Sequence, residues 1–244
     1  MKNLSGKYAI ITGGGQGLGA AMVKRFMEEQ AAGVAILDYN LEKAQAVAAE
    51  IGGNIIAIAC DVSKEEEVKS AIEQVLAAFG RIDILVNNAG IIRDAMFHKM
   101  TGDQWKQVID VNLNGLYYCC KYVVPLMRAQ CYGKIVNISS TSANGNAGQC
   151  NYSASKAAVE GFTKTLARES ARKNITVNAI EPAHIDTEMQ RSVPADILER
   201  SIKSNPSQRF GTPDELAAVA FFLASDDSSF VNGAVIPVCG GLRT

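Results

Sequence analysis

The sequence predicts an α/β fold, with one doubly wound domain, about seven parallel strands and helices on both faces of the sheet. Three observations lead to this prediction. Short apolar runs alternate along the chain with longer amphipathic segments. The apolar runs are nearly continuous in Val, Ile, Leu and Ala, as in strands that are covered on both faces. The 244 residues contain no internal repeat or linker, so a single domain over residues 1–244 is the simplest organisation.

Seven apolar runs predict the strands of this sheet. They are Tyr8–Thr12, Val34–Asp38, Ile55–Cys60, Ile82–Asn87, Lys134–Ile138, Ile175–Ile180 and Ala234–Val238. In open parallel sheets, ligands bind beyond the carboxyl ends of the strands, at the point where the strand order reverses. Functional residues are therefore expected directly after these runs.

The segments between the strands have the spacing of amphipathic helices. Leu18, Met22 and Phe26 recur on one helix face. Ser63 is a candidate N-cap for the helix after the third strand, because Glu66 follows three residues later in a capping-box arrangement. Further helices are expected over Asp103–Met127, Ser153–Arg172 and Pro213–Ala224.

Charge and composition exclude several classes of function. The 24 basic and 25 acidic residues give a formal net charge of −1, so nothing points to nucleic acid or an anionic membrane as a partner. The six cysteines form no metal-binding spacing and there are only two histidines, so no metal site is expected. The N-terminal apolar run is too short for an export signal. A cytoplasmic protein with free thiols and a small-molecule substrate is expected.

A glycine-rich turn follows the first predicted strand and leads into a helix. Residues 12–19 read Thr-Gly-Gly-Gly-Gln-Gly-Leu-Gly and fit the pattern G-x-x-x-G-x-G. Glycine permits a tight turn and close backbone approach, and a helix N-terminus offers N–H groups and positive potential to a pyrophosphate. A purely structural turn is the alternative, but the position between strand and helix favours the dinucleotide site of a Rossmann fold. The predicted cofactor contacts here are Gly13, Gly15, Gln16, Gly17, Leu18 and Gly19.

Asp38 ends the second predicted strand and bears on the choice of cofactor. An acidic residue at this place can accept hydrogen bonds from the adenosine ribose hydroxyls, and it repels a 2′-phosphate. Gln16 occupies the position in the turn where a basic residue would favour the phosphate, and Tyr39 follows Asp38. The alternative is an aspartate that only caps the strand end. The sequence predicts NAD(H) in preference to NADP(H).

Five motifs resemble those of the short-chain dehydrogenase/reductase family, in the same order and over essentially the whole chain. They are the glycine turn, Asp61-Val62, Asn87-Asn88-Ala89-Gly90, Asn112, and Tyr152-Ser-Ala-Ser-Lys156. Each motif is modest by itself, but the ordered set is highly specific. Within the family, the stretch A-G-I-I-R-D at Ala89–Asp94 resembles the 3-oxoacyl and acetoacetyl-CoA reductases.

Tyr152 and Lys156 supply the residue types that interconversion of a secondary alcohol and a ketone needs. Hydride transfer at carbon must be matched by proton transfer at oxygen, and an unperturbed tyrosine pKa of about 10 is too high for a base at neutral pH. Lys156 lies four residues later on the same helix face, where its charge is expected to lower the pKa of Tyr152. An ordinary amphipathic pair is the alternative. The resemblance implies that Lys156 also binds the nicotinamide ribose and that Asn112 holds a water linking Lys156 to solvent.

Two serines compete for the hydroxyl that orients the substrate oxygen and shares its developing charge. Counting forward from the fifth strand places Ser140 at the family's position, whereas counting back from Tyr152 with the commonest family spacing places Ser139 there. A shift of one residue along a strand turns the side chain to the other face. The strand count therefore carries more weight, and Ser140 is the predicted catalytic serine.

The resemblance implies further cofactor contacts after other strands. They are Asp61, Val62, Asn88, Ala89, Gly90, Pro182, Ile185 and Thr187, together with Tyr152 and Lys156. The chain departs from the family at Ala183, where glycine is usual, and His184 is expected to be a wall or loop residue. Cys131 stands where carrier-protein reductases usually have a basic residue, although Lys173 keeps a second one. This departure weakens the case for a carrier-protein substrate.

Residues 187–211 are expected to form a substrate lid. The apolar residues Met189, Val193, Ile197, Leu198 and Ile202 have the spacing of an amphipathic helix that could cover an apolar substrate. A segment that packs permanently on its own domain is equally consistent with this spacing.

The resulting hypothesis is an NAD(H)-dependent oxidoreductase that interconverts a secondary alcohol and a ketone, with Tyr152 as general acid and base. Candidate substrates are 3-oxoacyl or 3-hydroxyacyl thioesters, hydroxysteroids, and small diols or polyols. A sugar-nucleotide epimerase and a non-catalytic NAD-binding protein are the competing classes. The first would have a G-x-x-G-x-x-G turn, and the second would tend to lose Tyr152 or Lys156. The resemblance also implies a homotetramer built on the helices Asp103–Met127 and Ser153–Arg172.

Overall fold

A computed structural model describes residues 3–187 and 195–242, and its core is a parallel sheet of seven strands. The strands are β1 (Tyr8–Thr12), β2 (Gly33–Asp38), β3 (Ile55–Ala59), β4 (Ile84–Asn87), β5 (Gly133–Ile138), β6 (Ile175–Pro182) and β7 (Val235–Val238). Their order is β3-β2-β1-β4-β5-β6-β7, so the strand order reverses between β1 and β4. The predicted doubly wound Rossmann fold is confirmed.

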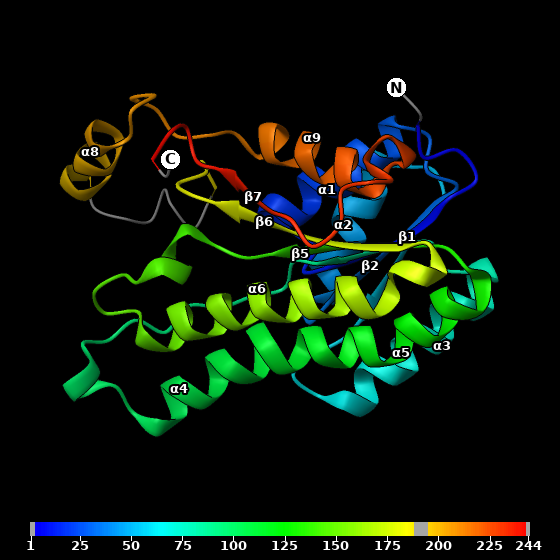
Figure 1. Ribbon diagram of the computed structural model, residues 1–244, viewed down its shortest axis with the longest axis horizontal. Helices are drawn as coiled ribbons and strands as arrows, with labels where there is room; N and C mark the ends of the chain where they lie inside the picture. The colour runs from blue at the N-terminus through cyan, green and yellow to red at the C-terminus, as the bar shows by residue number, and fades with distance from the viewer. Residues whose placement is uncertain (1–2, 188–194, 243–244) are drawn as a thin grey trace.

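Helices cover both faces of this sheet (Figure 1). They are α1 (Gly17–Glu28), α2 (Leu41–Ile51), α3 (Glu65–Phe79), α4 (Gly102–Ile109), α5 (Gly115–Gln130), α6 (Cys150–Ser170), α8 (Ala195–Ser204) and α9 (Pro213–Ala224). One apolar core lies between the sheet and α1, α2 and α9, and a second lies between the sheet and α3, α5 and α6. Nearly every residue of β1, β2, β4, β5 and β6 is buried, which explains why these strands read as continuous apolar runs.

Two local predictions differ from the structure. The helix expected over Asp103–Met127 is interrupted by a single π-helical turn, Asp110–Asn114, between α4 and α5. Such turns are frequent at functional sites, and this one contains Asn112. Ser63 does not cap α3, because that helix begins at Glu65 with Lys64 at the N-cap position. The Ser63 hydroxyl instead donates to Asp61 Oδ1 at 2.7 Å.

The predicted lid is described only in part. A helix is present over Ala195–Ser204, whereas Met189 and Val193 lie outside the described residues. The segment after this helix returns to the sheet, where Gly211 pairs with Ile185 in an isolated parallel bridge. Of the helices in the described part of the chain, none is both long enough and apolar enough to cross a membrane.

Candidate active site

The glycine turn between β1 and α1 lies where the strand order reverses. Gly13 and Gly17 have φ angles of +64° and +55°, a region that favours glycine. A Cβ atom on Gly19 would stand 2.1 Å from the carbonyl oxygen of Gly13, so this approach also requires glycine. Gln16 is the N-cap of α1 and its side chain makes no capping hydrogen bond, which leaves N–H groups of the first helical turn to a ligand. This turn fits a pyrophosphate.

Asp38 lies against this turn. Its carboxylate is 7 % exposed and accepts hydrogen bonds from the backbone N–H groups of Gly15 and Asn40, each at 2.9 Å. The structure thus brings the predicted residue Asp38 next to the predicted glycine turn. The prediction missed Lys43 in the first turn of α2, whose ammonium group donates to the Gln16 side chain. The sequence did show a lysine five residues after Asp38, which could have indicated a positive charge near the glycine turn.

Thr12 joins the end of β1 to the N-N-A-G motif after β4. Its hydroxyl accepts hydrogen bonds from the backbone N–H groups of Asn88 and Ala89, each at 3.0 Å. The Asn88 amide returns two bonds, to the carbonyl oxygens of Thr12 and Gly13. Sequence reasoning did not assign this role to Thr12. The motif after β4 and the glycine turn therefore form one rigid unit.

Asn112 in the π turn connects the loop after β4 to α6. Its Oδ1 accepts from Ile91 N at 2.8 Å, and its Nδ2 donates to Ile91 O at 3.1 Å and to Ser155 Oγ at 3.2 Å. Gly90 lies beside it, because a Cβ there would stand 3.4 Å from Asn112 Oδ1 and 3.5 Å from Lys156 Nζ. The structure thus brings the predicted asparagine next to the predicted lysine.

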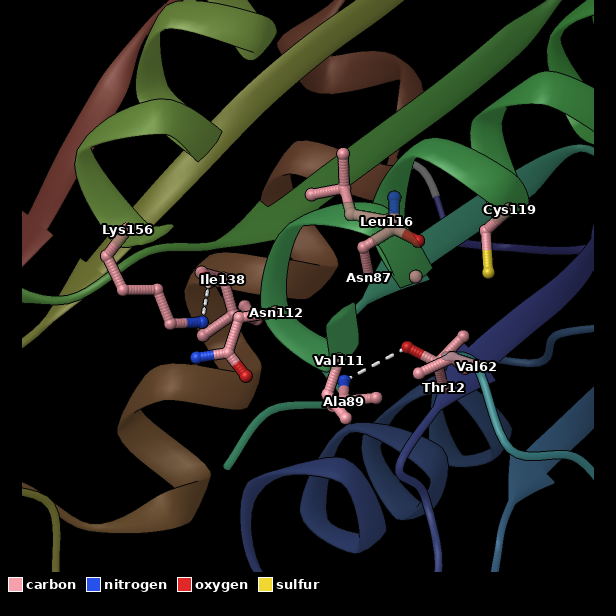
Figure 2. A pocket seen from close by; sticks show the side chains of 11 residues that line it. Thr12, Val62, Asn87, Ala89, Val111, Asn112, Leu116, Cys119, Ile138 and Lys156 are labelled. Atoms are coloured by element: carbon pink, nitrogen blue, oxygen red, sulfur yellow. Dashed lines mark hydrogen bonds between the residues drawn. The ribbon is translucent and has the colours of Figure 1, made fainter. Parts of the chain in front are cut away.

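Figure 2 shows Lys156, Asn112 and Ile138 together at one side of a pocket that Thr12 and Ala89 also line. Lys156 is only 4 % exposed, and its amine donates to Ile138 O at 2.7 Å. Burial lowers the pKa of Lys156 to about 8. The same amine lies 5.6 Å from the centre of the Tyr152 ring.

Tyr152 has a pKa above its usual value. Burial raises the pKa, the hydrogen bond with the Ser140 hydroxyl lowers it by a smaller amount, and the charge of Asp94 raises it. The net shift of the Tyr152 pKa is therefore upward, opposite to the direction expected from Lys156, because burial has the largest effect. In this environment the phenol holds its proton at neutral pH.

The two candidate serines point to different partners. Ser139 donates to Lys156 O at 3.3 Å and to Glu160 Oε1 at 2.9 Å, both on α6. The Ser140 hydroxyl accepts from Ser142 N at 3.2 Å and lowers the pKa of Tyr152. Ser139 is therefore engaged with α6, and Ser140 remains the predicted catalytic serine.

The remaining predicted contacts lie near this edge of the sheet or close to the glycine turn. Val62 lines the pocket, and Asp61 accepts hydrogen bonds from Ser63. Pro182 ends β6 and is buried. A Cβ on Gly17 would stand 4.0 Å from the Thr187 methyl group, which places Thr187 beside the glycine turn. Ile185 is 4 % exposed and takes part in the bridge to Gly211.

His184 lies in the segment after β6 and packs against Phe210. Its ring lies 5.6 Å from that of Phe210, and burial lowers its pKa. Among the described residues, no three His, Cys, Asp or Glu side chains are grouped so that they could hold a metal ion. All six cysteines are free thiols.

Comparison with known proteins gives the class of this chain. A family profile described as enoyl-(acyl carrier protein) reductase matches residues 13–243. The chain belongs to the short-chain dehydrogenase/reductase family.

Its similar relatives carry related names. The chain is 44 % identical over 242 residues to a 3-oxoacyl-(acyl-carrier-protein) reductase FabG of Thermotoga maritima, with 98 % of each chain covered. It is 47 % identical over 237 residues to an acetoacetyl-CoA reductase of Shinella zoogloeoides, with 96 % of this chain and 98 % of that one covered. A crystal structure of a 3-ketoacyl-(acyl-carrier-protein) reductase from Brucella melitensis, complexed with NADH, matches with a TM-score of 0.93 at 35 % identity, covering 99 % of this chain and 100 % of that one.

These findings confirm an oxidoreductase that acts on CH–OH groups with a nicotinamide cofactor. The residues present fit that cofactor on structural grounds. The turn leaves no room for a Cβ at Gly14, Gly15 or Gly19 and presents an uncapped helix N-terminus. Asp38 lies where the adenosine ribose of such a ligand would be bound.

Proposed function

We propose that this protein is an NAD(H)-dependent 3-oxoacyl thioester reductase that also runs in reverse as a 3-hydroxyacyl dehydrogenase. The observation that carries the proposal is the position of Lys156 Nζ, 5.6 Å from the centre of the Tyr152 ring, at the edge of the sheet that also holds the glycine turn and Ser140. The names of relatives at 44 % and 47 % identity support the substrate class.

The residues divide the chemistry in the following way. The nicotinamide supplies a hydride to the carbonyl carbon when the cofactor is bound. Tyr152 donates its phenolic proton to the carbonyl oxygen, which becomes the hydroxyl group of the product. Ser140 donates a hydrogen bond to the same oxygen and stabilises the negative charge that develops there. Lys156 stabilises the phenolate that remains, and Asn112 holds the loop at Ile91 against α6.

The preference for NAD(H) is also part of the proposal. The Asp38 carboxylate accepts hydrogen bonds from two backbone N–H groups. Its negative charge would repel the 2′-phosphate of NADP(H). Lys43 adds a positive charge nearby, but its ammonium group already bonds to Gln16. Kinetics with both cofactors test this point, and a clear preference for NADPH would refute it.

The acyl group is proposed to be carried by coenzyme A rather than by a carrier protein. Cys131, at the end of α5, is exposed where a basic carrier contact would be expected. A second candidate substrate class is a diketone. A crystal structure of levodione reductase supports it, with a TM-score of 0.93 at 34 % identity, covering 98 % of each chain.

A substrate panel tests these proposals. Each substrate is supplied with NADH or NADPH, and oxidation of the cofactor is followed by absorbance. The substrates are acetoacetyl-CoA, an acetoacetyl carrier protein, a cyclic diketone and an enoyl thioester. We expect turnover with acetoacetyl-CoA and NADH. Tyr152→Phe is expected to abolish turnover while NADH still binds, as measured by fluorescence titration. Wild-type turnover in this variant would end the proposed mechanism.

We also propose a single functional domain, a homotetramer and a cytoplasmic location. Exposed aromatic side chains on α4 and α5, among them Trp105 and Tyr117, support burial of these helices between subunits. Six free thiols agree with a reducing compartment. Light scattering coupled to size-exclusion chromatography measures the oligomeric state, and a monomer would contradict the proposed assembly.

A further inference from the structure

Glu181 is a buried acidic residue beside the candidate active site that the proposed chemistry does not use. It lies next to the end of β6 and is 1 % exposed. Its Oε1 accepts a hydrogen bond from Asn144 Nδ2 at 2.8 Å. Burying a carboxylate costs free energy unless the carboxylate is hydrogen-bonded. The bond from Asn144 lowers this cost and holds the two side chains in position.

Asn144 closes the short 3-10 turn Thr141–Asn144 that follows the candidate catalytic serine. The same Nδ2 also donates to Thr141 O at 3.2 Å. At the other end of the turn, Ser140 is the N-cap: its Oγ accepts from Ser142 N at 3.2 Å, and its carbonyl oxygen accepts from Ala143 N at 2.9 Å. Ser142 N–H engages the oxygen of Ser140 and not its hydrogen, so the hydroxyl keeps its one donor for another partner.

The sheet alone does not hold this turn. The ladder between β5 and β6 ends at the pair Ile138–Ile180, and one further bond joins Ser139 N to Ile180 O at 2.8 Å. Glu181 is the next residue of β6, so its side chain continues the connection after the backbone pairing has stopped. Gly145 follows Asn144 with a φ angle of +104°, so the chain changes direction directly after the turn.

We propose that Glu181 is a positioning residue: by holding Asn144, it fixes the turn and thereby aims the Ser140 hydroxyl at the substrate oxygen. This inference rests on the proposed function. It adds a residue that acts through Asn144 and Ser140 and does not touch the substrate.

The test compares Glu181→Ala, Glu181→Gln, Asn144→Ala and the double variant Glu181→Ala/Asn144→Ala. The loss of a hydrogen bond to a carboxylate is expected to lower kcat for ketone reduction by about tenfold in Glu181→Ala and in Asn144→Ala. Glu181→Gln keeps an acceptor and is expected to stay within about threefold of the wild type. The double variant is expected to lose less than the product of the two single losses, because both changes break the Glu181–Asn144 bond.

Further measurements separate positioning from general destabilisation. KM for the ketone and Kd for NADH are expected to remain within about twofold of the wild type. The apparent pKa for alcohol oxidation is expected to rise in Asn144→Ala, since the Ser140 bond is what lowers the pKa of Tyr152. Asp226→Asn is the matched control, because Asp226 Oδ1 accepts a hydrogen bond from Tyr132 at 2.9 Å away from the site, and its kcat should not change.

The outcomes are distinguishable. Asn144 is an exposed loop residue, so Asn144→Ala is expected to fold even if Glu181→Ala does not, and melting curves check both. A folded Asn144→Ala variant with wild-type kcat and an unchanged pH profile would overturn the inference, as would losses that multiply in the double variant. If Tyr152→Phe retains turnover, the proposed function itself fails. If Tyr152→Phe is inactive while the Glu181 and Asn144 variants are normal, only the role of Glu181 fails.

Discussion

Gly15→Ala is expected to weaken NADH binding by disturbing Asp38. A Cβ on Gly15 would stand 2.9 Å from Asp38 Oδ2 and 3.1 Å from Ala44 N, closer than carbon normally approaches either atom. Gly15 is not among the residues with positive φ, so the substitution adds no backbone strain and acts through this contact alone. The carboxylate must rotate and give up its 2.9 Å bond from Gly15 N. A hydrogen bond to a charged group contributes about 1.5–3 kcal/mol, which predicts a rise in Kd of about 10- to 100-fold.

Fluorescence titration with NADH measures this change, and melting curves show whether the variant remains folded. Gly102→Ala is the matched control, because a Cβ at that exposed position meets no atom within 4 Å. It is expected to leave Kd unchanged. A Gly15→Ala variant that binds NADH as the wild type does would show that the Asp38 carboxylate does not shape the adenosine site.

Two further predictions concern the roles of single side chains. Ser140→Ala is expected to reduce kcat by about 100-fold or more and to raise the apparent pKa for alcohol oxidation. Ser139→Ala should leave that apparent pKa unchanged. The pH–rate profiles of both variants test this, and a larger loss of kcat in Ser139→Ala would make Ser139 the catalytic serine. Asp38→Asn removes the negative charge at the ribose position and is expected to raise the NADPH/NADH ratio of kcat/KM by about tenfold or more, and an unchanged ratio would contradict the role given to Asp38.

The sheet was predictable because its strands are buried on both sides. Each predicted strand overlaps an observed one, and the boundaries differ by at most two residues. The π turn at Asp110–Asn114 was not predictable in the same way. Its residues continue the helical periodicity of their neighbours, and the extra residue is stabilised by contacts of Asn112 with Ile91 and Ser155, which are distant in the sequence. The local pattern of apolar residues does not predict contacts between residues that are distant in the sequence.

The site shows the same division. The motifs placed Gly13, Asp38, Tyr152 and Lys156 at one edge of the sheet, because strand ends and helix starts determine where they lie. The partners of Thr12 and Glu181 depend on side-chain directions across strands, which the sequence does not specify. Resemblance to the family also gave no guide to Glu181, since its partner Asn144 lies in a loop whose length differs from the common spacing.

Charge states within the site follow from burial more than from the distance between Tyr152 and Lys156. Burial disfavours the charged form of each group, so it raises the pKa of the phenol and lowers that of the amine to about 8. Below these values Tyr152 keeps its proton and Lys156 is cationic, the state that reduction of a ketone requires. Oxidation of an alcohol requires the deprotonated phenol, so its rate should rise with pH while reduction levels off at lower pH. The charge states of Tyr152 and Lys156 therefore favour reduction at neutral pH.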